Sequence, residues 1–373
     1  MSEHDILGDA IERLEWDERK QEETPAKKWH QVTRRAALTG GAAGIAALAL
    51  EACGSSNNAS ASSSSASSIF GFNKSQHYVL VNHVTTNIFF TPTQNGAADA
   101  CKLLGCSYTW TGSSTSNVGE MVNAINSAIT GKADGIASSL ISPTAFNKPV
   151  QSALSAGIPF IAYNADEPQT GRLSYIGQDL FLSGQEMGKH IASLVPSGEI
   201  ALFIATPGAA NIQPRINGAL DTLKSHPSIK PKVVATGAAV PAELTVINSW
   251  ATGHSSAKGM FAVDAGSTQG VAQTIQKQGL RQKGWKGGGY DLTPITESLL
   301  SKGYIDFTID QQPYLQGFLP ILQLYLYNAS DRLTGIAETD TGLKFLTKST
   351  ITPYASTKSR YEGTGTSPGV QKS

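Results

Sequence analysis

The chain has 373 residues with 29 acidic and 29 basic side chains, so its formal net charge is zero. The first 53 residues hold ten of the acidic and seven of the basic side chains, which leaves the remainder with a net charge of about +3. This charge is far below the basic bias of nucleic-acid-binding proteins, and we expect no nucleic-acid partner. Beyond the N-terminal region, the length is sufficient for two domains of roughly 150 residues each.

The N-terminal region has the pattern of an export signal. An arginine pair, Arg34 and Arg35, precedes a run at 36–50 that is rich in Ala and Gly. That run is shorter than the roughly 20 apolar residues that span a bilayer. Paired arginines before a short apolar run are typical of a bacterial twin-arginine signal. The sequence LEAC at 50–53 resembles a lipobox, which predicts lipidation of Cys53, although Glu51 replaces the small residue usual there. We therefore expect residues 1–53 to be a lipoprotein signal peptide of an exported protein anchored to the cell membrane.

Residues 54–75 are dominated by Ser, Ala, Asn and Gly as far as residue 68. Such a composition cannot bury enough apolar surface to fold, so we predict a flexible tether. Residues 355–373 are predicted to be a disordered tail. No later segment is long and apolar enough to cross a membrane, because polar residues and Pro320 interrupt the nearest candidate, 315–327.

After residue 75, short apolar strands alternate with amphipathic helices. In the first half we expect strands at 78–82, 108–110, 135–141 and 158–163, and helices at 91–104, 119–130 and 144–156. In the second half we expect strands at 175–177, 199–204, 232–235, 259–263, 286–290 and 305–309, and helices at 182–194, 214–225, 242–252, 268–278, 293–301 and 314–327. The pattern predicts an α/β protein with two Rossmann-like, doubly wound lobes, each built on a parallel sheet.

Polar and aromatic side chains collect just after the predicted strands. They are Asn87, Phe89 and Phe90 after the first strand, Asn164 and Asp166 after the fourth, and Arg215, Asp264, Asp291 and Gln311 in the second half. Ligands of such sheets bind at the carboxyl ends of the strands. Amides, carboxylates and an arginine beside aromatic rings suit a neutral polyhydroxylated ligand. Taken singly, each Asp or Asn could instead form a turn or cap a helix.

Three cysteines are present. Cys101 and Cys106 are five residues apart, and outside the cell they could form a local disulfide. Equally, they could be two buried small apolar side chains. No second cysteine pair or histidine cluster completes a metal site, and no metal or other cofactor is expected.

Several segments together resemble one protein family. They are NIFF at 87–90, IPFI at 158–161, YIGQD at 175–179 followed by Gly184 and Gly188, RING at 215–218, YD at 290–291 and TIDQQP at 308–313. Their order and spacing are similar to those of the ribose-binding-protein group of type I periplasmic (solute) binding proteins, which serve ABC importers. The resemblance covers residues 78–351, nearly all of the predicted folded part.

The resemblance implies a ligand-binding set shared by the two lobes. Its members are Asn87, Phe89, Phe90, Asn164, Arg215, Asp264, Asp291 and Gln311. In the ribose group, an Asp-Arg pair stands where this chain has Asn164 and Ala165, so Asp166 could take part of the missing role. An aromatic residue of the relatives is absent near Val240. Trp110 could supply a ring face instead, or it could be a half-buried strand residue. Both departures favour another monosaccharide or a polyol over ribose.

The resemblance also implies a hinged organisation and a mechanism. Residues 76–178 with 312–340 would form the N-terminal lobe, and 179–311 with 341–354 the C-terminal lobe. Three segments would join them, near 166–179, at Gln311 and near 339–342. The ligand would bridge the lobes and favour a closed state that docks, as a monomer, on a membrane permease with its ATPase. No catalytic residue is expected.

Three alternatives share parts of this pattern. A lac-type repressor has the same core, but an export signal and a tether occupy the place of its DNA-binding helices. A sugar-modifying enzyme would need a catalytic constellation, and the glycines at 287–289 lack the spacing of a dinucleotide-binding loop. A receptor for a small sugar-like signal, feeding a sensor, has the same sequence features as an uptake protein.

Overall fold

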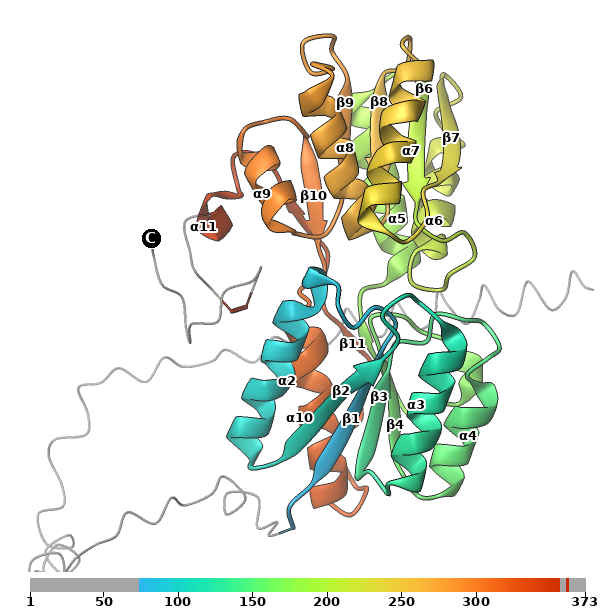
Figure 1. Cartoon of the computed structure of the whole chain (residues 1–373), viewed down its shortest axis with the longest axis vertical. Helices are drawn as coiled ribbons and strands as arrows, with labels where there is room; N and C mark the ends of the chain where they lie inside the picture. The colour runs from blue at the N-terminus through green and yellow to red at the C-terminus, as the bar shows by residue number, and fades with distance from the viewer. Residues whose placement is uncertain (1–73, 356–359, 362–373) are drawn as a thin grey trace, which may run out of the picture. The chain divides into compact units, whose positions relative to one another are not determined.

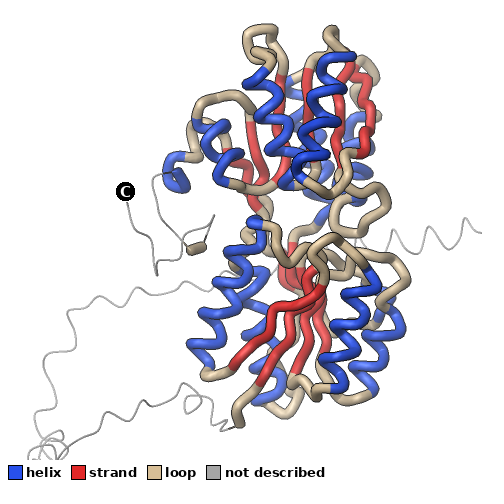
Figure 2. Tube along the Cα trace, in the orientation of Figure 1, coloured by secondary structure: helices blue, strands red, loops and turns tan. Residues whose placement is uncertain are grey.

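The computed structural model describes residues 74–355, 360 and 361. The predicted signal peptide, Cys53, most of the tether at 54–75 and most of the tail at 355–373 lie outside these residues. In the described part, strands and helices alternate and the strands form two six-stranded sheets. Figure 2 shows strands in red with helices in blue around them. The predicted α/β class with two doubly wound lobes is therefore confirmed.

The first sheet is parallel throughout, in the order β11-β5-β4-β3-β1-β2. Its strands span His77–Asn82 (β1), Ser107–Gly112 (β2), Gly135–Ser138 (β3), Phe160–Tyr163 (β4), Tyr175–Gly177 (β5) and Thr339–Asp340 (β11). All but one come from the first half of the folded region. The exception, β11, returns from near the C-terminus to pair with β5.

Helices cover both faces of this sheet. Helices α2 (Thr91–Leu104) and α10 (Leu315–Ala329) lie on one face, and α3 (Val118–Thr130) and α4 (Asn147–Ser155) on the other (Figure 1). Successive strand residues point to opposite faces. In β1, Tyr78 and Leu80 therefore pack under α2 and α10, whereas Val79 and Val81 pack under α3 and α4. Burial on both faces explains why residues 78–81 of this strand are hydrophobic without interruption.

The second sheet has the order β12-β10-β9-β8-β6-β7. Its strands span Gly198–Ile204 (β6), Ile229–Ala235 (β7), Gly259–Ala262 (β8), Lys286–Tyr290 (β9), Phe307–Asp310 (β10) and Lys344–Leu346 (β12). All of them are parallel except β12, which runs antiparallel to β10. The five strands that the sequence predicted for this sheet are parallel, as expected. The edge strand β12 was not predicted, and it is antiparallel because it enters directly from β11 of the other sheet and so runs away from the carboxyl ends of its neighbours.

The second sheet is also covered on both faces. Helices α5 (Leu180–Leu194) and α6 (Gln213–Leu223) pack on one face. Helices α7 (Val240–Gly253), α8 (Ala265–Lys277) and α9 (Pro294–Ser301) pack on the other. The short elements are the 3-10 turns η2 (Ile88–Phe90) and η3 (Pro168–Thr170) and the helix α11 (Thr352–Ala355).

The chain passes between the two sheets after β5, after β10 and after β11. Hydrogen bonds tie these three connections together. The carbonyl oxygen of Gln311 accepts from Thr341 Oγ1 at 2.8 Å, and Gln178 Nε2 donates to the carbonyl oxygen of Gly342 at 3.0 Å. The connections therefore form one three-segment hinge.

Cys101 is buried in α2 and Cys106 follows that helix, and both thiols are free in this structure. The amide of Cys106 donates to the carbonyl oxygen of Cys101 at 3.1 Å, as part of the turn that ends the helix at Gly105. The predicted alternative of a local disulfide is thus not what the structure contains. Among the described residues, none of the helices has the length and apolar character needed to cross a membrane.

Replacing Gly184 with Ala is expected to destabilise the fold. A Cβ atom there would lie 2.2 Å from the carbonyl oxygen of Arg215, because α5 and α6 meet backbone to backbone. Such overpacking costs about 1–3 kcal/mol, which urea denaturation can measure. The matched control is Gly253→Ala, at a helical glycine with no heavy atom within 4 Å of the added carbon. Equal losses in both variants would contradict the tight α5–α6 contact.

Candidate functional site

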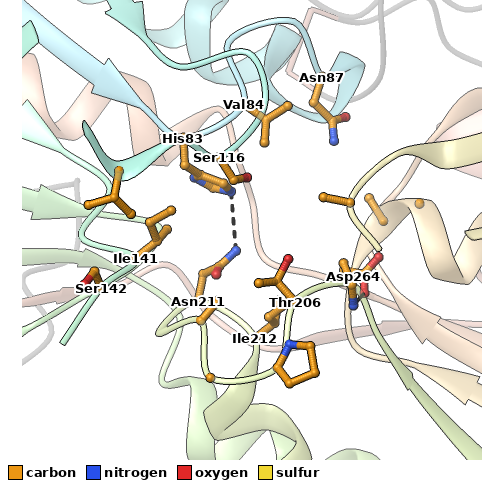
Figure 3. Close-up of a pocket in the computed structure, with 18 of the residues that line it drawn as sticks. His83, Val84, Asn87, Ser116, Ile141, Ser142, Thr206, Asn211, Ile212 and Asp264 are labelled. Atoms are coloured by element: carbon orange, nitrogen blue, oxygen red, sulfur yellow. Dashed lines mark hydrogen bonds between the residues drawn. The ribbon is translucent and has the colours of Figure 1, made fainter. Parts of the chain in front are cut away.

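The carboxyl ends of the strands in both sheets border a shared cleft. One cavity of about 300 Å³ is lined by residues of both lobes, including His83, Ile141, Asn211 and Asp264 (Figure 3). A second cavity of about 60 Å³ adjoins it and shares His83, Asn87, Asn211, Ile212, Asp264 and Ala265 with it. We call the two cavities together the cleft, and the smaller one its inner part.

Most of the residues predicted from the sequence converge on the inner part of the cleft. Eight of them line it: Asn87, Phe89, Phe90, Asn164, Arg215, Asp264, Asp291 and Gln311. Seven of them follow five different strands, and Arg215 lies in the first turn of α6, so only the folded topology brings them together. Trp110 and Asp166 are not among the residues that line the cleft.

The first lobe supplies an aromatic wall. Asn87 caps the 3-10 turn η2, with its Oδ1 accepting from the Phe89 amide at 3.0 Å. The turn aims Phe89 and Phe90 inward, and their rings meet edge to face at 4.8 Å. Trp110 lies behind Phe90 at 6.1 Å and donates its Nε1 hydrogen to the Thr85 carbonyl oxygen. Trp110 therefore supports the aromatic wall from β2 rather than facing the cavity.

Asp166 has a different environment. Its Oδ1 accepts from Arg172 Nε at 2.6 Å, and Arg172 also pairs with Glu338. Asp166 lines a separate cavity with Tyr175 and residues of the hinge. Asp166 lies two residues beyond Asn164 and points away from the cleft, where it forms an ion pair with Arg172 that the sequence analysis did not predict.

Arg215 is the charged centre of the inner part and is 2% exposed. Its Nη1 donates to the Val263 carbonyl oxygen at 2.9 Å, and its guanidinium lies 4.1 Å from the centroid of the Tyr290 ring. Nη2 donates weakly to Gln178 Oε1 at 3.4 Å. Among the described residues, no acceptor is in reach of its Nε hydrogen. Because a buried donor without a partner is costly, a ligand oxygen at this position would be strongly favoured.

Asp291 and Asn164 belong to one hydrogen-bond chain that runs through the hinge. Asp291 Oδ1 accepts from Gln311 Nε2 at 2.6 Å, and Asn164 Nδ2 donates to Gln316 Oε1 at 3.0 Å. Gln316 Nε2 donates in turn to Gln311 Oε1 at 3.1 Å. Burial raises the pKa of Asp291 to about 6, whereas Arg215 acts to lower it.

Both Asn164 and Asp291 adopt positive φ angles, of 63° and 70°. Strained backbone of this kind clusters at functional sites.

Asp264 combines the two roles that the sequence left open. It caps α8, with Oδ1 accepting from the Ser267 amide at 2.8 Å, and Oδ2 accepts from the Ala205 amide at 3.0 Å. It also lines both cavities. Each oxygen keeps a lone pair after these bonds, so capping the helix leaves Asp264 able to accept a hydrogen bond from a ligand.

Sequence reasoning missed a pair of residues that joins the lobes across the cleft. His83 Nε2 and Asn211 Nδ2 are 3.3 Å apart, the contact dashed in Figure 3. Burial lowers the pKa of His83 to about 4. The neutral ring donates from Nδ1 to Ser139 Oγ and accepts from Asn211 at Nε2. Beside this pair, the Ala210 amide donates to the Ile141 carbonyl oxygen at 3.0 Å. We call these two contacts the latch. His83 follows β1 directly, which is the signal that was available, whereas Asn211 lies in a loop without periodicity.

The cleft offers hydrogen-bond donors and acceptors, with both positive and negative charges, beside the aromatic wall. Among the described residues, no group of three or more His, Cys, Asp or Glu side chains is placed to hold a metal ion. The arrangement can orient and enclose a small polar molecule with one apolar face through hydrogen bonds from both lobes.

Comparison with known proteins agrees with this geometry. A model of the periplasmic binding protein domain matches residues 78–329. The chain is 54% identical over 303 residues to the xylose/arabinose-binding protein XylF of Sulfolobus acidocaldarius, covering 77% of this chain and 75% of that protein.

Solved structures have the same fold. One is an ABC transporter solute-binding protein from Burkholderia graminis in complex with D-arabinose, with a TM-score of 0.71 and 26% identity over 75% of this chain and 98% of that one. Another is a carbohydrate transporter from Acidothermus cellulolyticus in complex with myo-inositol, with a TM-score of 0.67 and 24% identity over 76% of this chain and 97% of that one. The chain therefore belongs to the periplasmic binding protein family, whose members act outside the cytoplasm.

Proposed function

We propose that this protein binds a neutral monosaccharide or sugar alcohol outside the cytoplasm and delivers it to the permease of an ABC importer. The observation that carries the proposal is the inner part of the cleft. There the donors of Arg215, the carboxylates of Asp264 and Asp291 and the faces of Phe89 and Phe90 meet around one small cavity. The XylF relative makes xylose and arabinose the first ligands to test.

The mechanism follows from the sharing of the cavity between lobes. Asn87 and the phenylalanines come from the first lobe, whereas Arg215 and Asp291 come from the second. A ligand that contacts both lobes binds their closed arrangement better and shifts the population towards it. The hinge would provide the pivot, and the latch would add contacts between the lobes that stabilise the closed arrangement. Binding and release are sufficient for this role, so the proposal includes no catalytic step and no cofactor.

The N-terminal sequence completes the proposal. Export by the twin-arginine route would deliver a protein already folded, and lipidation of Cys53 would anchor it beyond the membrane. The tether at 54–75 would let a monomeric receptor reach its permease and ATPase. The lobes would comprise 76–178 with 312–340 and 179–311 with 341–354.

Removing Arg215 is expected to abolish sugar binding. In a thermal-shift screen of the full chain with pentoses, hexoses, 6-deoxysugars and polyols, the ligand at a hundredfold excess over its Kd should stabilise the protein by ~2.7 kcal/mol. Arg215→Ala removes the unpaired Nε donor and should eliminate the shift, and Asp291→Ala should do the same by removing an acceptor. The control is Arg332→Ala, at an exposed arginine outside the cleft. Unchanged shifts in both cleft variants, with normal circular dichroism, would rule out this site.

Asn211→Ala should weaken sugar binding without touching the inner hydrogen-bond chain. Loss of its contact with His83 removes about 0.5–1.5 kcal/mol from the closed state, which predicts a Kd about 2–10 times higher by calorimetry. The exposed Asn123 on α3 gives the matched control, Asn123→Ala, whose Kd should equal that of the unmodified protein. A Kd for Asn211→Ala equal to that of this control would mean that the latch does not contribute to closure.

Cys53→Ser should convert a membrane-bound protein into a released one. A thioether to a lipid requires the cysteine sulfur, so fractionation of cells expressing the two forms should find the variant in the soluble extracytoplasmic fraction. Its sugar affinity should be unchanged, because Cys53 precedes the folded lobes. A variant that stays with the membrane would argue against lipidation at this residue.

A further inference from the structure

A second carboxyl group lies beside Asp264, and the proposed function does not use it. Glu243 stands in the first turn of α7, is 2% exposed and lines the larger cavity together with Asp264. Gly266 leaves the room for it, since a Cβ atom there would lie 1.9 Å from Glu243 Oε2. The chain thus places two carboxyl groups side by side at the border of the inner cavity.

The surroundings of the two carboxyl groups decide which one holds a proton. Asp264 accepts two backbone amide hydrogen bonds, and both favour its charged form. Among the described residues, none donates a hydrogen bond to Glu243 Oε2. The two carboxyl groups are in hydrogen-bonding contact, and burial, followed by the charge of Asp264, raises the pKa of Glu243 to about 9. At neutral pH, Glu243 is therefore a carboxylic acid that donates to the Asp264 carboxylate.

Other charged and titratable groups reach this pair from neighbouring elements. Burial raises the pKa of Asp264, whereas its two backbone amide donors and the positive charge of Arg215 on α6 act to lower it. Asp291, after β9, lies on the same inner cavity. His83 faces the pair from the first lobe and is neutral above a pKa of about 4.

We propose that Glu243 is a positioning residue for ligand binding. Its protonated carboxyl group donates a hydrogen bond to the Asp264 carboxylate and so orients that carboxylate towards a hydroxyl group of the ligand. The inference rests on the proposed function, because it concerns the same ligand. The shared proton limits the pair to one negative charge. After the two backbone amides and Glu243, one lone pair of Asp264 remains, and a hydroxyl donor is its natural partner. Loss of the Glu243 proton would leave two adjacent negative charges buried. Glu243 would then no longer donate a hydrogen bond to Asp264 but would repel its carboxylate.

The test is the pH dependence of affinity for D-xylose, or for L-arabinose if that sugar binds more tightly, measured by calorimetry on the full chain from pH 6.5 to 10. The Kd of the unmodified protein should be flat to about pH 8 and then rise, reaching about tenfold at one pH unit above the pKa of Glu243. Glu243→Gln supplies a donor of the same shape that does not ionise. Its Kd should resemble that of the unmodified protein at pH 7 and stay flat to pH 10.

Glu243→Ala separates positioning from simple packing. It removes the donor, so its Kd should be raised at every pH and should lack the alkaline rise. Where this variant fails to fold, the Gln variant alone still decides the question. An alkaline rise of equal size in Glu243→Gln, or a flat profile in the unmodified protein, would overturn the inference. Absence of sugar binding by the unmodified protein at pH 7 would instead overturn the proposed function.

Discussion

The structure depends on one hydrogen-bond chain, which runs from Asn164 through Gln316 and Gln311 to Asp291. Its ends line the inner part of the cleft on opposite lobes, and its middle crosses the hinge at the end of β10. Because every link is an amide or a carboxylate in a buried place, each must keep a partner in any arrangement of the lobes. The chain thereby connects the geometry of the pivot with the groups that a ligand would contact.

The arginine of the cleft depends on the packing of the second lobe. α5 and α6 approach so closely that glycines are required at their contact, and this contact fixes the helix that carries Arg215. The guanidinium is then held by a carbonyl oxygen and by the face of Tyr290, while Nε keeps no partner among the described residues. A rigid donor that is buried before the ligand arrives loses little conformational entropy on binding. The same feature makes the cleft selective for ligands that carry an acceptor at this position.

The sequence predicted much of this arrangement because parallel sheets place the carboxyl ends of all their strands at one edge. The ends of the strands could be recognised from apolar runs in the sequence. The convergence of the polar residues that follow them could therefore be predicted without knowing the distances between them. The errors have the same physical origin. Asp166 also follows a strand, but Arg172 draws it into an ion pair six residues away. The strands β11 and β12 are too short to show a pattern. Asn211 and Glu243 were missed because neither lies at a strand end, and their importance comes from contacts with His83 and Asp264 that only the folded chain creates.

The charges in the cleft finally explain why it suits a neutral ligand. Arg215 contributes one positive charge, Asp291 one negative charge at neutral pH, and the pair of Glu243 and Asp264 one more because it retains a proton. The cleft is thus close to electrical balance, with a small excess of negative charge. An anionic ligand would add further negative charge in a place with little water. The hydrogen bonds that it gains would not offset this unfavourable energy. A hydroxyl group carries no such cost, and it can donate to a carboxylate and accept from Arg215 at the same time. The balance of charge and the supply of donors and acceptors therefore select the same class of molecule.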